Sequence, residues 1–331
     1  MKKLSTFAMV LSSLFSPFVM GAETDQFYVG SAVIRDSSLE MNSFFHEKIE
    51  LALSIVNEEK NPVNCRLAAK EVLQQVVGDV NLIEWGKNKS FSKISVFTQT
   101  SPLIDRFPLD NISEKEFRAY SIYKNRPFPV NIVGVARTLN INGIYIGTDK
   151  LGHFSIVGKT YYKNFLNGLD EGLNPEAAQA EAIKKGLKQE IALLGYAVGG
   201  TFAYGDLEAN YQGLQFGRNM CEGANPYLKL VNGKWMQNPE NIFDIRKYVT
   251  PKFDEAYNVS FWSPRMWKKM KTDIVSAYCR NKIDPGYRAR VVDYSKRDAS
   301  SINDKLLEEF LKEKPKFNRS NQLLSKNIEC N

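Results

Sequence analysis

Apolar residues recur at helical spacing in two segments near the start of the chain. Residues 41–58 place apolar side chains at intervals of three or four, and Asn61-Pro62 ends this pattern. The spacing returns over residues 65–77, where the apolar positions are Cys65, Ala68, Ala69, Val72, Leu73, Val76 and Val77. Such intervals put the side chains on one face of a helix. We therefore expect an antiparallel pair of helices.

A β-hairpin and three more helices are expected in the middle of the chain. The dipeptide Asn142-Gly143 separates two short apolar runs, which is the pattern of a tight hairpin turn. Residues 79–129 contain four prolines and no sustained period, so we expect loop with short elements there. The helical patterns that follow cover residues 149–168, 175–198 and 206–220.

The last third of the chain is expected to be aromatic-rich and irregular until a final helix. Its rings after Cys221 follow no clear period; they are Tyr227, Trp235, Phe243, Tyr248, Phe253, Tyr257, Phe261, Trp262 and Trp267. An amphipathic helix is expected over residues 302–312, followed by a polar C-terminal tail over residues 313–331. The predicted fold is mainly α, a single helical domain over residues 23–312 with a small β-hairpin and long irregular segments.

Composition supports a globular protein. Of the 331 residues, 43% are hydrophobic and 24% are charged, which excludes a disordered chain and a multi-pass membrane protein. The longest apolar stretch of interest, Ile191–Gly205, has no charge but is shorter than the about 20 residues that a membrane span needs.

The N-terminus has the pattern of a secretory signal peptide. Lys2 and Lys3 precede an uncharged, mostly apolar stretch over residues 4–20, and small residues follow. We expect residues 1–22 to be removed, and the protein to reside in the periplasm or outside the cell. The net charge of +7 then falls to +5. This weak basic excess suits an anionic cell-wall or envelope polymer, or peripheral contact with a membrane, and without a basic run it does not indicate nucleic acid.

Four cysteines are expected to be structural in an oxidising compartment. Cys65, Cys221, Cys279 and Cys330 permit two disulfides in any of three pairings. No C-x-x-C spacing occurs, so neither a zinc ribbon nor a thioredoxin-type redox site is indicated. Because Cys65 lies on the apolar face of a predicted helix, a free core thiol is the alternative there.

The candidate functional residues are polar side chains on the three central helices. Asp149 and His153 are four residues apart on one helical face, where a carboxylate can orient an imidazole. Glu190 lies at an apolar helix end, where a carboxylate must pair or take up a proton. We expect these faces to converge. The candidate catalytic residues are Asp149, His153, Glu190 and Asp206, and the candidate binding residues are Lys150, Glu208, Asn210 and Gln215.

This order of residues resembles the VanZ-like family. The matching motifs lie within residues 147–218 and are Asp149-Lys150-x-x-His153-Phe154, Glu190, and Asp206-x-x-x-Asn210-x-x-Gly213 with Gly217. The family consists largely of membrane-spanning helices, and it commonly has Gln where this chain has Leu193 and an Arg before the Asp, which this chain lacks. The resemblance implies an envelope protein that acts on or senses a cell-wall or lipid-linked component, and some members are linked to tolerance of glycopeptide antibiotics. It supplies no mechanism.

Two other functions are compatible with the same residues. Glu190 before a glycine-rich turn is weakly similar to the general acid of lysozyme-like peptidoglycan glycosidases, with Asp206 or Glu208 as the second carboxylate. The other alternative is a non-catalytic envelope binding or scaffolding protein. A closed cluster would favour that role, and a long open groove at Glu190 would favour the cell-wall hydrolase. One histidine among three acids fits no standard zinc set, and no nucleotide motif occurs, so neither a metal nor a cofactor is expected.

Overall fold

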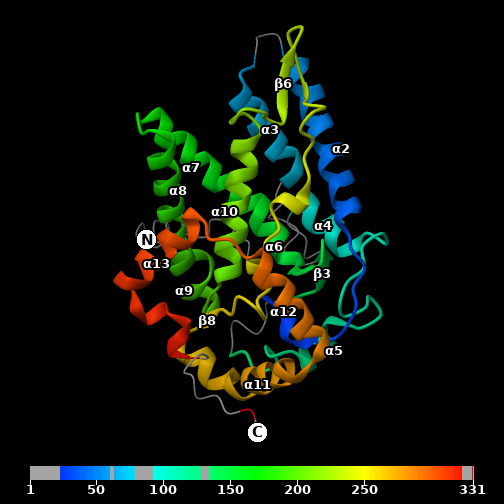
Figure 1. Ribbon diagram of the computed structural model, residues 1–331, viewed down its shortest axis with the longest axis vertical. Coiled ribbons are helices and arrows are strands. Elements are labelled where there is room, and N and C mark those ends of the chain that lie inside the picture. Colours follow the sequence, from blue (N-terminus) through cyan, green and yellow to red (C-terminus); the bar gives the residue numbers. More distant parts are fainter. Residues whose placement is uncertain (1–22, 60–62, 79–91, 128–133, 323–329, 331) are drawn as a thin grey trace, which may run out of the picture.

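The protein is mainly helical, as predicted (Figure 1). The computed structural model describes residues 23–59, 63–78, 92–127, 134–322 and 330, so the predicted signal peptide lies outside the described residues. The first two long helices are α2 (Ser38–Asn57) and α3 (Cys65–Val77), which pack along each other. The expected helical pair is confirmed.

The three expected central helices are also present, the first two with π-helical turns. Residues 148–170 and 175–199 each contain one such turn, a rare geometry that occurs often at functional sites. In chain order these elements are α6 (Thr148–Gly152), η4 (His153–Val157), α7 (Gly158–Asp170), α8 (Pro175–Gln189), η5 (Glu190–Leu194), α9 (Tyr196–Gly199) and α10 (Tyr204–Asn219). α7 packs against both α8 and α10, and this trio forms the middle of the molecule.

The predicted β-hairpin consists of β3 (Thr138–Ile141) and β4 (Ile144–Gly147). Both turn residues, Asn142 and Gly143, have positive φ angles of 53° and 81°, as a type I′ turn requires. The other strand pairs are short: β1 (Glu23–Thr24) with β2 (Val135–Ala136), β5 (Thr201–Phe202) with β8 (Phe261–Trp262), and β6 (Leu228–Val231) with β7 (Lys234–Gln237).

The sequence pattern predicts an irregular chain after Cys221 until a final helix at residues 302–312, and this prediction is wrong for the part beyond Trp262. Two long helices follow, α11 (Pro264–Ile283) and α12 (Pro285–Arg297). Each has a proline in its first turn directly after a capping side chain, Ser263 for α11 and Asp284 for α12, which is a local start signal for a helix. The remaining helical elements are α4 (Lys93–Thr100), α5 (Glu114–Tyr120), α13 (Ile302–Glu313), η1 (Gln26–Tyr28), η6 (Ile245–Lys247), η7 (Pro251–Phe253), η8 (Pro315–Phe317) and η9 (Arg319–Asn321).

Most rings of the aromatic-rich segment belong to the core. Phe243 lies 4.5 Å from Phe45 and 4.8 Å from Phe216 between ring centroids, so the segment is packed against α2 and α10. The C-terminal tail is likewise packed in part. Phe317 of η8 is buried, and its carbonyl oxygen accepts a hydrogen bond of 2.7 Å from the Tyr204 hydroxyl.

Two disulfides join distant segments. Cys65 pairs with Cys221, and Cys279 pairs with Cys330, which decides among the three pairings and excludes a free Cys65 thiol. The first disulfide ties the start of α3 to the residues after α10, and the second ties α11 to the C-terminal tail. Disulfides of this kind are typical of extracytoplasmic proteins. None of the helices in the described ranges has the length and apolar character that a membrane span requires.

Candidate functional site

A buried lysine lies at the centre of the predicted polar cluster. The Nζ atom of Lys150 lies 2.6 Å from Asp149 Oδ2, 2.7 Å from Asp206 Oδ1 and 2.6 Å from Glu255 Oε1. Burial alone would lower the pKa of Lys150, but the charges of these three carboxylates raise it well above its usual value. Lys150 therefore remains a cation at neutral pH although it has no exposed surface.

The β3–β4 hairpin places Asp149 and Lys150 in the cluster. β4 ends at Gly147, and the chain enters α6 at the next residue. A Cβ atom on Gly147 would lie 1.8 Å from Thr24 Oγ1 and 2.0 Å from Asp149 Oδ1. Glycine thus leaves room for the Asp149 carboxylate and for the Thr24 hydroxyl that donates to it. The first turn of a helix also favours an acid through the helix dipole.

His153 connects η4 to α10. Its Nε2 lies 3.3 Å from Asp206 Oδ2, and its Nδ1 lies 3.1 Å from Asn210 Oδ1. The two segments can approach because α10 carries Gly213, where a Cβ atom would lie 1.9 Å from the Phe154 carbonyl oxygen. The structure therefore brings the predicted polar faces of the first and third central helices together.

Glu190 reaches the same cluster from η5. It is 1% exposed, and its Oε1 accepts a hydrogen bond of 3.4 Å from the Ala203 backbone N–H. Burial, and next the negative charge of Asp206, raise the pKa of Glu190 well above its usual value. Glu190 accordingly holds its proton at a pH where an exposed glutamate has lost it. Gly195 is again required, since a Cβ atom there would lie 2.0 Å from Glu190 Oε1.

Two acids outside any sequence motif complete the cluster. Glu255 follows η7 in the aromatic-rich segment, and Glu23 begins β1 beside the predicted cleavage site. Burial raises the pKa of Glu23 to about 7, while the charge of Arg126 opposes this rise. Burial likewise raises the pKa of Glu255 well above its usual value, against the attraction of Lys150. No local sequence signal marks either residue, because their partners lie far away along the chain.

The carboxyl groups of the cluster therefore differ in charge. Burial alone would raise the pKa of Asp206, but the charges of His153 and Lys150 lower it below its usual value. Asp206 is an anion paired with the Lys150 ammonium, whereas Glu23, Glu190 and Glu255 retain protons more readily. Protonation of these acids limits the uncompensated negative charge in a region of low dielectric constant.

Two predicted binding residues lie outside the cluster. Glu208 accepts hydrogen bonds from Gln212 Nε2 at 2.8 Å and from Thr250 Oγ1 at 3.1 Å. Gln215 Nε2 donates to Gln179 Oε1 at 3.0 Å, toward α8. A helix turns roughly 100° per residue, so Glu208 points about 200° away from the face that carries the cluster. Only Lys150 and Asn210 of the candidate binding residues belong to the cluster.

Asp149, Asp206 and Glu255 are the described residues that could ligate a metal ion, since their oxygens lie within 4.8 Å of one another. The Lys150 ammonium already lies between them, at hydrogen-bonding distance from each. A metal ion at this centre would have to displace a lysine that is fully buried. The three carboxylates thus bind the Lys150 ammonium, and they leave no place for a metal ion next to it.

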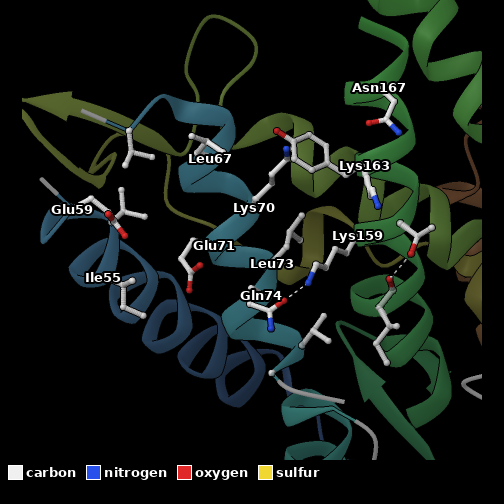
Figure 2. Close-up of a pocket in the computed structure, with 17 residues that line it drawn as sticks. Ile55, Glu59, Leu67, Lys70, Glu71, Leu73, Gln74, Lys159, Lys163 and Asn167 are labelled. Atoms are coloured by element: carbon white, nitrogen blue, oxygen red, sulfur yellow. Dashed lines mark hydrogen bonds between the residues drawn. The ribbon is translucent and has the colours of Figure 1, made fainter. Parts of the chain in front are cut away.

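The cluster is closed to bulk solvent. His153 is 4% exposed, Asp206 7% and Asn210 1%. A large groove does exist, but it lies over α3 between α2 and α7, and no member of the cluster lines it (Figure 2). An enzyme that cleaves a polysaccharide presents its carboxyl groups on a groove that holds the sugar chain. Glu190 does not lie on such a groove. Its carboxyl group is enclosed, which is the arrangement expected for a non-catalytic role.

No protein-family model, curated protein or solved structure matches this chain. The resemblance of residues 147–218 to the VanZ-like family therefore stays a prediction. Its motif residues do form one physical site, because Asp149, Lys150, His153, Asp206 and Asn210 contact one another directly or through one shared partner.

The substitution Glu190→Gln is expected to make the protein less sensitive to alkaline pH. A raised pKa in the folded state stabilises the wild type below the unfolded value of 4.5, and this stabilisation is lost as the pH rises toward the folded pKa. Glutamine keeps the shape of the protonated acid and cannot ionise. We expect nearly equal unfolding free energies at about pH 4 and a more stable variant at about pH 9, with a slope difference of up to ~1.4 kcal/mol per pH unit in between.

Urea unfolding of both proteins across this pH range measures the difference. Glu181→Gln is the matched control, because Glu181 is half-exposed on α8 and its ion pair with Lys185 is long, at 3.9 Å. The control should follow the wild type at each pH. If the unfolding free energy of Glu190→Gln were lower than that of the wild type by the same amount at every pH, Glu190 would be ionised and paired in the folded protein.

Proposed function

We propose that the protein is a non-catalytic binding protein of the extracytoplasmic envelope and that its buried cluster is structural. The observation that carries this proposal is the enclosure of the candidate catalytic side chains, which are paired with one another instead of facing a substrate groove. Export through a signal peptide at residues 1–22, to the periplasm or the outside, is part of the proposal, and the two disulfides support it.

The cluster has a structural role of its own in this proposal. Lys150 comes from α6, Asp206 from α10 and Glu255 from the segment after η7, so one ammonium group holds three separate parts of the chain. Glu190 adds η5 to them through Ala203. These contacts orient the central helices, and ligand binding is left to the outer surface. The ligand is a cell-wall or lipid-linked component of the envelope.

A peptidoglycan glycosidase is the second candidate, and one observation favours it. A general acid must hold a proton before it meets its substrate, and the raised pKa of Glu190 favours this protonated form. Burial of the carboxyl group opposes this role, because a leaving-group oxygen must come within hydrogen-bonding distance of it.

Purified peptidoglycan distinguishes the two functions. We expect the protein lacking residues 1–22 to release no soluble sugar or peptide fragments, while it sediments with an envelope fraction that contains both wall and membrane. Fragments that appear with the wild type and disappear with Glu190→Gln would overturn the non-catalytic assignment. Failure to sediment with the envelope fraction would overturn the binding role.

A further inference from the structure

The large groove of the protein has α3 as its floor and α2 and α7 as its walls (Figure 2). Its volume is about 1060 Å³, at the upper end of the range for ligand sites. The floor runs along α3 from Leu67 to Val77, which is about 15 Å of helix. The groove thus has room for an extended molecule rather than for a small ion alone.

The side of the groove next to α7 is cationic. Lys159 and Lys163 lie four residues apart on α7, and Lys70 faces them from α3 (Figure 2). Lys159 donates a hydrogen bond to Gln74 Oε1. Lys70 and Lys163 are exposed, and neither forms an ion pair with a carboxylate of the described residues. Three ammonium groups on one side of a groove, two from its wall and one from its floor, attract an anion.

The side of the groove next to α2 is largely apolar. Ile55 and Leu67 are 37% and 49% exposed there, and Leu73 and Val77 form the floor beneath. Two acids also line the groove. Glu59 lies at the α2 side, and Glu71 Oε1 accepts a hydrogen bond of 2.7 Å from the Gln75 side-chain amide. An anionic group is therefore favoured on the α7 side and an apolar chain on the α2 side.

We propose that this groove binds an anionic phospholipid, with its phosphate against Lys70, Lys159 and Lys163 and an acyl chain along Ile55 and Leu67. This ligand is chosen because its negative charge matches the lysines and its acyl chain matches the apolar surface of the same groove. A hydrophilic anionic glycan would leave the apolar half exposed to water, and an uncharged chain would bring no negative charge to the lysine side of the groove. The inference names a ligand for the proposed binding role, and it rests on that role only for its biological setting.

Binding of dihexanoyl-phosphatidylglycerol, used as a monomer in solution, tests the inference by calorimetry on the protein lacking residues 1–22. We expect it to bind at least roughly tenfold more tightly than dihexanoyl-phosphatidylcholine, which has no net charge, and than glycerol 3-phosphate, which has no acyl chain. The double substitution Lys70→Ala/Lys163→Ala should weaken binding roughly 25-fold, because each basic side chain near a lipid phosphate contributes about a fivefold factor.

The matched control is Lys184→Ala/Lys188→Ala, which removes two exposed lysines of α8 that lie four residues apart outside the groove. It should bind as the wild type does. Equal weakening by both double substitutions, or equal affinity for the three probes, would overturn the lipid site. Either of those results leaves the sedimentation and peptidoglycan outcomes unaffected, so a failure here is distinct from a failure of the proposed function.

Discussion

Replacement of the buried lysine, Lys150→Met, is expected to destabilise the protein by roughly 3 to 5 kcal/mol. Asp149, Asp206 and Glu255 would remain buried at the same place without their shared counter-charge. Methionine fills the volume of the aliphatic stem, so the loss reports the charge and not a cavity. Because the stranded carboxyl groups can take up protons, the loss should be larger at alkaline than at acidic pH.

Urea unfolding at two pH values measures this loss, with Lys185→Met as the control. Lys185 is 40% exposed at its side chain and pairs weakly with Glu181, so its replacement should change stability by less than about 1 kcal/mol. A Lys150→Met protein with near wild-type stability would mean that the three carboxyl groups are already neutral in the folded state. The cluster would then not be held together by ion pairs.

Removal of the disulfide between α3 and the end of α10, by Cys65→Ser/Cys221→Ser, is the second large effect expected. The two cysteines are 156 residues apart, and the loss of loop-closure entropy in the unfolded chain corresponds to ~5 kcal/mol. The Cys279–Cys330 disulfide closes 51 residues, for which the same relation gives ~4 kcal/mol. We therefore expect the Cys65–Cys221 disulfide to stabilise the protein more.

Urea unfolding of the two double variants, each with the other disulfide intact, compares them directly. Addition of a reductant should bring the wild type below either variant, and it should not change a variant that lacks both disulfides. If removal of Cys279–Cys330 proved more harmful, packing of the C-terminal tail through Phe317 would outweigh the entropy of loop closure.

Local sequence pattern predicted the regular elements well where one face of the element is apolar. The helices at residues 41–58 and 65–77 and the hairpin at Asn142-Gly143 all occur where the pattern places them. The pattern was insufficient for α11, whose apolar residues Met266, Met270 and Ile274 stand among many lysines and arginines. Its start signal, Ser263 before Pro264, is the feature that identifies this helix.

The sequence by itself determined which residues form the helical half of the cluster. Asp149 and His153, and likewise Asp206 and Asn210, are four residues apart, so helical geometry alone places each pair on one face. Only the tertiary structure decided that Glu255 and Glu23 join them, that Glu208 and Gln215 lie elsewhere, and how the cysteines pair. The physical reason is the separation along the sequence between the interacting residues. A helical period is set by neighbours within one or two turns. Burial and ion pairing depend instead on segments that come together from distant parts of the chain.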